Sequence, residues 1–136
     1  MASKSDESPG LGDIELLQTP SLPKTADPIL QHFTHYFGRM LGRLTIRTDS
    51  PYMYQAVVFT ARDRIMDRWA KTRLALERDH VRRVSYLSIE FLMGRLLHNE
   101  LLSVGIEDET REALGRLGLD LETVFDREAD AGLGNG

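Results

Sequence analysis

The longest periodic pattern in the chain runs from residue 51 to about residue 79 and predicts a single long helix. Ser50 is placed to cap its N-terminus, and Pro51 suits the first helical position. Apolar side chains recur every three or four residues and form one stripe: Tyr54, Val58, Ala61, Ile65 and Trp69. Helices in globular proteins average about 11–12 residues. A helix this long needs a large surface to lie against.

An earlier helix is predicted over residues 26–44, with Asp27 as N-cap and Pro28 at the first helical position. Its apolar face follows the same period: Ile29, Phe33, Tyr36, Met40 and Leu44. Gly38 and Gly42 weaken the helix by about 1 kcal/mol each. Their spacing predicts that another backbone passes closely there.

Three shorter helices are predicted after residue 93. Residues 94–104 place Leu97, Leu101 and Val104 on one side, and Gly105 suits the C-terminal stop. Residues 107–117 begin with three acidic residues, which favours the positive end of a helix. Residues 120–127 give about two turns from an Asp120 cap.

The helical period breaks at residues 82–91, which predict one strand. Neither side of this strand is thoroughly polar, as is typical of a strand buried on both faces of a parallel sheet. No second strand is found to pair with it. The fold class is therefore α/β, in a chain that is mostly α-helical with one parallel-type strand.

Composition narrows the class of protein. With 41% hydrophobic and 28% charged residues the profile is soluble and globular, and no apolar run reaches the ~20 residues of a membrane span. The absence of cysteine fits the cytoplasm and leaves no thiolate metal site. Basic residues dominate 31–83, but interleaved carboxylates and the absence of aromatic residues among them argue against nucleic acid. Residues 1–24 are rich in Ser, Pro, Gly and charge, and predict a disordered tail.

Glu90 is the first candidate for chemistry, because it stands at the carboxyl end of the predicted strand, where open α/β sheets bind ligands. A carboxylate among Phe91, Leu92 and Met93 must be solvated, paired or functional. The alternative is a structural ion pair, for which Arg95 is the nearest partner in sequence.

The second candidate is the glycine-rich sequence "AGLGNG" at residues 131–136. Glycines allow backbone N–H groups to approach an anion closely, which makes Gly134, Asn135 and Gly136 candidate phosphate-binding residues. The spacing is not that of a dinucleotide-binding loop, and a plain turn or loose terminus is the alternative. His32 and His35 lie three residues apart, but no further ligand of suitable spacing follows, so no metal site is predicted.

Together, "YLSIEFLMGRLLHNELL" and "DAGLGNG" resemble the N-terminal region of the glycogen/α-glucan (maltodextrin) phosphorylases. "SPYMYQAVVFTARDRIMDRWAKT" is similar to that family's long second helix, and "HFTHYFGRMLGR" to the first helix of its bacterial members. The resemblance covers residues 26–136. It implies that 25–136 is an incomplete N-terminal domain of a GT-B phosphorylase, cut within the glycine loop.

The resemblance implies an enzyme that phosphorolyses terminal α-1,4-glucosidic bonds and releases α-glucose 1-phosphate. It further implies a homodimer with an α-1,4-glucan and inorganic phosphate as substrates and pyridoxal 5′-phosphate as cofactor. By position, Asn135 and Gly136 belong to the loop against the sugar and phosphate, and Glu90 to the edge of that site. The lysine that binds the cofactor has no counterpart here, so the fragment is expected to be inactive and to bind no cofactor.

Two further expectations follow. Glu77 falls where animal members place an aromatic residue against a nucleotide activator, and residues 1–24 lack their basic phosphorylation segment. This pattern favours an unregulated, bacterial-type member. The alternative function, from a different class, is a helical protein-interaction module whose two long helices form a dimer contact without catalysis.

Overall fold

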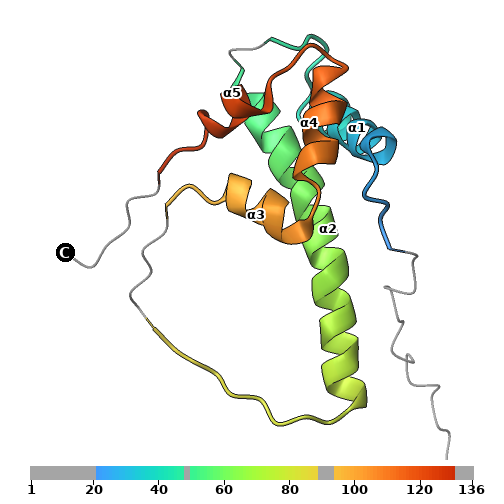
Figure 1. Ribbon diagram of the computed structural model, residues 1–136, viewed down its shortest axis with the longest axis vertical. Helices are drawn as coiled ribbons and strands as arrows, with labels where there is room; N and C mark the ends of the chain where they lie inside the picture. The colour runs from blue at the N-terminus through green and yellow to red at the C-terminus, as the bar shows by residue number, and fades with distance from the viewer. Residues whose placement is uncertain (1–20, 48–49, 89–93, 131–136) are drawn as a thin grey trace, which may run out of the picture.

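A long central helix, α2, organises the rest of the chain in the computed structural model, which describes residues 21–47, 50–88 and 94–130 (Figure 1). The elements are α1 (Ala26–His35), a π-helical turn η1 (Tyr36–Met40), α2 (Pro51–Arg78), α3 (Leu97–Val104), α4 (Glu107–Gly115) and α5 (Leu121–Phe125). Helices α1, α3 and α5 pack on α2, and α4 packs on α1. The described residues contain no strand.

The sequence prediction for α2 is confirmed at both ends. The Ser50 hydroxyl accepts a hydrogen bond from the Tyr52 amide, Pro51 is the first helical residue, and the helix ends at Arg78. The buried face is displaced from the predicted stripe. The stripe residues Tyr54, Val58 and Ile65 lie at the margin of the core, and Trp69 is 53% exposed. The fully buried face is Met53, Ala56, Val57, Thr60, Ala61, Arg64 and Ala70.

The first helix is shorter than predicted and begins two residues earlier, at Ala26 instead of Pro28. Thr25, not Asp27, occupies the N-cap, because its backbone is extended while Ala26 is already helical. Asp27 lies in the first turn, where an anion suits the helix dipole, and it pairs with Arg116 at the end of α4. Its side chain therefore joins two helices instead of capping one.

Helix α1 ends because its backbone hydrogen bonds change from the α-helical spacing of four residues to spacings of five and six residues and then stop. The Leu41 amide donates to the Tyr36 carbonyl, the Arg43 amide donates to that of Phe37, and Gly42 adopts a left-handed φ of +64°. The helix therefore never reaches Leu44, which is 98% exposed. Within the described residues the predicted close approach of another backbone at Gly38 and Gly42 is not found: outside the helix's own backbone, an added Cβ at Gly38 would meet only the Arg43 carbonyl oxygen, at 4.0 Å, and at Gly42 nothing within 4 Å.

The three short helices agree with the sequence prediction. Leu97, Leu101 and Val104 are buried on one side of α3. Gly105 ends this helix with φ +70°, and its amide bonds back to the Leu101 and Leu102 carbonyls. At the start of α5 the Asp120 carboxylate accepts a hydrogen bond from the Glu122 amide.

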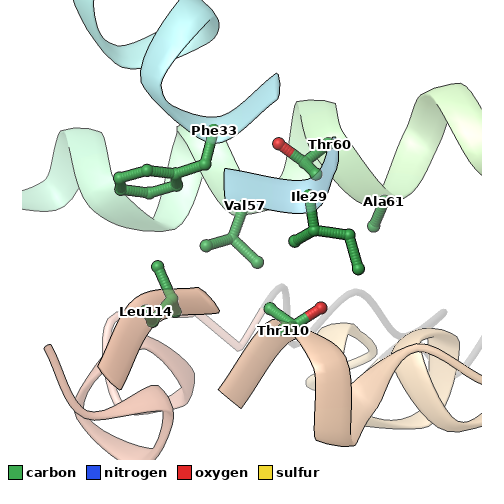
Figure 2. A pocket seen from close by; sticks show the side chains of 7 residues that line it. All are labelled: Ile29, Phe33, Val57, Thr60, Ala61, Thr110 and Leu114. Carbon is green, nitrogen blue, oxygen red and sulfur yellow. The ribbon is translucent and has the colours of Figure 1, made fainter. Parts of the chain in front are cut away.

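A single apolar core lies between α2 and the four other α-helices. Its largest fully buried side chains are Ile29, Phe33, Met53, Val57, Leu101, Ile106, Leu114, Leu121 and Val124. Figure 2 shows its centre, where side chains of α1, α2 and α4 surround a cavity of ≈ 10 Å³ with an apolar lining. A space of this size holds at most about one water molecule. The core is therefore closely packed where these three helices meet.

The predicted strand at residues 82–91 is not confirmed. Residues 81–88 follow α2 as extended chain without strand pairing, and Val84, Tyr86 and Leu87 are almost fully exposed; residues 89–91 lie outside the described residues. The physical reason is that a parallel strand needs neighbouring strands for its backbone N–H and C=O groups, and the described chain offers none. Among the helices described here, none is both long and apolar enough to cross a membrane.

Candidate functional site

The residues predicted to line a ligand site, Glu90, Gly134, Asn135 and Gly136, lie outside the described residues. The second half of the first motif, from residue 94 onward, and the chain that precedes the second motif are both described. These two stretches, residues 95–98 and 125–128, meet in space, and we call them the junction. The junction is where the structure brings the surroundings of the two motifs together.

Glu128 is the centre of the junction. Its carboxylate accepts hydrogen bonds from the backbone amides of Leu96, at 2.8 Å, and Leu97, at 3.2 Å and 3.0 Å to its two oxygens. The side chain is buried, with a residual exposure of 9%. An anion at the first amides of α3 is favoured by their unpaired N–H groups and by the helix dipole. Glu128 therefore caps a helix that begins 31 residues before it.

Two further contacts close the junction. Arg95 Nη1 lies 3.8 Å from Asp126 Oδ1, and the His98 and Phe125 rings stack with their centroids 4.7 Å apart. Both members of the ion pair are well exposed, so this pair contributes little to stability. Arg95, proposed from sequence as a partner for Glu90, has Asp126 as its partner within the described chain.

An open hollow of about 260 Å³ lies beside the junction, between α2 and the start of α3. Tyr54, Val58 and Ile65 form its α2 side, and Leu96 and Glu128 border it opposite. Burial raises the pKa of Tyr54, and the charge of Glu128 and a hydrogen bond to its carboxylate raise it further. Tyr54 thus stays protonated and adds a neutral donor beside the carboxylate.

A second polar cluster lies between α1 and α2. The Tyr36 hydroxyl donates to the Asp63 carboxylate, and His32 Nδ1 lies 4.0 Å from the same oxygen. Burial, the Asp63 hydrogen bond and the Asp63 charge raise the pKa of Tyr36 to about 12. Burial and the nearby Arg64 lower the pKa of His32, against the opposing effect of Asp63. His32 is therefore neutral at neutral pH.

Metal chemistry finds no support in this cluster. His32 and His35 were the residues considered from sequence, and His35 instead packs its ring edge-on against Tyr36 at 5.5 Å. Within the described ranges, no three His, Cys, Asp or Glu side chains come together as metal ligands.

The two lysines of the described residues both form hydrogen bonds within the chain. Lys24 donates to the Val104 carbonyl, and Lys71 bonds to Ser21 and to Asp67 on its own helix. These bonds link residues 21–24 to Val104 and to α2, and link two side chains on the surface of α2.

Two structurally important residues, Arg64 and Glu128, could not be identified from the sequence. Arg64 is 2% exposed, and its guanidinium donates to the Pro23 and Thr60 carbonyls. The sequence places it among many charged residues of α2, with no sign that it points inward. Glu128 stands in an acidic stretch that is typical of a solvated surface. Only the long-range packing identifies either one.

The glycogen phosphorylases are the relatives that sequence comparison finds. "Glycogen phosphorylase 2" of Dictyostelium discoideum is 36% identical over 115 residues, which is 85% of this chain and 12% of that protein. "Glycogen phosphorylase, brain form" of Homo sapiens is 41% identical over 105 residues, which is 77% of this chain and 12% of that protein. "Glycogen phosphorylase" of Pasteurella multocida is 34% identical over 112 residues, which is 82% of this chain and 14% of that protein. The chain spans about an eighth of the length of these curated relatives, and no protein-family model matches it.

Proposed function

We propose that this chain, which is homologous to the glycogen phosphorylases, forms part of the N-terminal domain of an α-glucan phosphorylase with the GT-B fold. The observation that carries the proposal is 36% identity over 85% of the chain, together with two motifs in family order. The enzyme is a glycosyltransferase that transfers a terminal α-1,4-linked glucosyl group to inorganic phosphate. The same proposal includes a cytoplasmic location and a bacterial type without nucleotide control.

In this proposal residues 25–130 form a scaffold, and residues 131–136 belong to the loop at the sugar and phosphate. The backbone N–H groups of Gly134, Asn135 and Gly136 would face anionic oxygens, as glycine-rich turns do elsewhere. Glu90 would stand at the edge of that site. The helical scaffold supports this assignment, because a rigid framework is what an anion-binding loop needs in order to hold its amides in place.

Pyridoxal 5′-phosphate belongs to the proposed whole enzyme, in which it would supply a phosphate group for proton transfer. In this proposal the lysine that binds the cofactor lies outside residues 25–136. No step through the cofactor is therefore assigned to this chain.

The test is a chimera in which residues 25–136 replace the aligned segment of the Pasteurella multocida glycogen phosphorylase. We expect phosphate-dependent release of glucose 1-phosphate within about tenfold of the parent rate, a loss of roughly 1.4 kcal/mol at most. The matched variant Asn135→Ala should lower this rate further. A chimera that folds and elutes like the parent but releases no glucose 1-phosphate would contradict the proposal.

The chain by itself is expected to be inactive. Purified material should show neither pyridoxal absorbance nor glucose 1-phosphate release from an α-1,4-glucan. Either signal in pure chain would overturn this part of the proposal while leaving the homology intact.

A second candidate function, a helical dimerisation module, is favoured by exposed apolar side chains outside the core. Met40 and Leu44 protrude beyond α1, and Met66 and Trp69 protrude from α2. Large apolar side chains gathered on a surface often mark protein interfaces. Sedimentation separates the two ideas: a defined oligomer that Trp69→Arg disrupts supports the module, whereas a monomer or undefined aggregate supports the scaffold of a larger enzyme.

A further inference from the structure

We propose that residues 81–87 are a self-complementary β-strand, through which a second copy of this chain binds in antiparallel orientation. This pairing uses only described residues of the 136-residue chain. It does not depend on the proposed function, and it uses a different surface from the exposed side chains of α2.

The segment 81–87 stands away from the helical core. Helix α2 ends at Arg78, and His80 then takes a left-handed φ of +46° that redirects the chain. Figure 1 shows the following residues as an extended arc that lies apart from the helices before the chain returns to α3. All seven residues are exposed, and no backbone hydrogen bond between described residues joins them to another element. Both edges of the segment are therefore open to a partner.

The side chains of this segment suit a strand better than a solvated loop. Val84 is 97% exposed, Tyr86 89% and Leu87 91%. Branched and aromatic side chains favour strands, and the segment contains neither Gly nor Pro. Its length is close to that of an ordinary strand. An open apolar edge of this kind is a template for pairing with another chain, and the described residues of this chain contain no strand to occupy it.

Charge selects the orientation of the second copy. Arg82 and Arg83 stand together near one end, and no acidic residue lies between 81 and 87. Parallel pairing in register would set each arginine beside its equivalent at the strand spacing of about 4.8 Å, and like charges in adjacent positions destabilise a sheet. Antiparallel pairing places the arginines of the two copies at opposite ends. The antiparallel orientation is therefore favoured.

A register centred on Val84 pairs every residue of the segment. Val84 then lies opposite its own equivalent on a two-fold axis, which is the symmetry of a closed dimer. The other opposed pairs are Arg82 with Tyr86, Arg83 with Ser85, and Val81 with Leu87. The first sets a cation beside an aromatic ring and the last joins two apolar side chains, and both kinds of pair are favourable. Moving the centre to Arg83 would oppose two cations, and moving it to Ser85 would leave Val81 without a partner in the segment.

The first experiment is disulfide cross-linking of the 136-residue chain. The chain has no cysteine, so Val84→Cys introduces a single thiol. Directly opposed residues have Cα atoms about 4.5–5.5 Å apart, within the range of a disulfide. Leu87→Cys is the matched control, because Leu87 is equally exposed but would lie about 20 Å from its equivalent along the paired strands.

Under mild oxidation Val84→Cys should give at least about tenfold more covalent dimer than Leu87→Cys, since only the first pair meets disulfide geometry. Equal cross-linking of the two variants would indicate parallel pairing or random collision and would overturn the proposal. Failure of both variants to cross-link would overturn it as well.

The second experiment is sedimentation equilibrium at increasing protein concentration, with far-UV circular dichroism to check that the helices are intact. The parent chain should associate reversibly. Val84→Lys should remain monomeric, because two ammonium groups would meet on the two-fold axis. Leu44→Lys is the control, since Leu44 is 98% exposed and lies outside the segment; it should associate like the parent, and so should Trp69→Arg. A monomeric parent refutes the strand pairing, and so does association that Trp69→Arg abolishes and Val84→Lys retains.

Discussion

Replacement of Arg64 should expose how residues 21–24 are held to the helical core. The guanidinium is buried on α2 and joins two parts of the chain that lie 41 residues apart. Its Nε and Nη2 both donate to the Pro23 carbonyl, at 3.2 Å and 2.9 Å, and its Nη1 donates to that of Thr60 at 3.0 Å. Arg64→Ala removes all three bonds and the buried stem.

The magnitude can be worked from these contacts. Arg64→Ala removes two buried methylene groups, Cγ and Cδ, which contribute about 1.6 kcal/mol at roughly 0.8 kcal/mol each. The hydrogen bonds to Pro23 add about 1.5–3 kcal/mol, typical for bonds from a charged group. Burial lowers the pKa of Arg64, however, so desolvation of the cation offsets part of that gain. We expect Arg64→Ala to cost about 3 kcal/mol, and Arg64→Met, which keeps an apolar stem, about 1–2 kcal/mol.

The assay is urea unfolding of the 136-residue chain at neutral pH, followed by far-UV circular dichroism. Arg68→Ala is the control, because Arg68 is exposed and donates one bond, to the Ser103 carbonyl at 2.9 Å. It should cost no more than about 0.5 kcal/mol. If Arg64→Ala and Arg68→Ala prove equally stable, Arg64 is not an internal anchor and the reasoning fails.

Four other predictions concern single positions. Gly105→Ala should destabilise the chain by about 1 kcal/mol because its φ is +70°, while Gly115→Ala, with open space around it, should be neutral or slightly stabilising; equal effects in urea unfolding would contradict the left-handed end of α3. Thr110→Ser should cost about 1 kcal/mol by removing a methyl group beside the core cavity; a variant as stable as the parent in calorimetry would refute the packing. Folding lowers the pKa of His32, so the unfolded chain binds a proton at His32 more tightly than the folded chain does. The free energy of unfolding is therefore unaffected by His32 above pH 6.5 and decreases as the pH falls below it. His32→Gln should reduce this loss of stability on the acid side of a stability–pH profile. The pKa of about 12 for Tyr36 acts in the opposite sense: its contribution is complete below pH 10 and is lost as the pH rises toward 12, and Tyr36→Phe should remove that alkaline loss.

The local signals in the sequence were sufficient for α2, α3 and α5. Ser50 with Pro51, Gly105 and Asp120 act on the backbone groups next to them, so their effect does not depend on the rest of the fold. The same kind of signal misplaced the start of α1, where two polar residues on either side of Ala26, Thr25 and Asp27, could both serve as N-cap. A cap is local, but the choice between neighbouring caps depends on the partner of Asp27 on α4.

The candidate site was only partly accessible from sequence. The motifs around Glu90 and Asn135 could be recognised from their residues, and homology with the phosphorylases followed. The contact of Glu128 with the start of α3 could not be recognised from sequence, because Glu128 lies 32 residues after Leu96 and 31 residues after Leu97. No pattern of neighbouring residues carries that information.

For this protein the sequence alone determined the existence of the helices, the ends of α2, and the relationship to the phosphorylases, since each depends on residues close together in the chain. The tertiary structure decided which face of α2 is buried, that Arg64 and Glu128 point inward, and that residues 82–88 form no strand without partners. The physical reason is the same in each case. Burial and hydrogen-bond pairing are satisfied by whichever groups the fold brings near, and those groups lie tens of residues away.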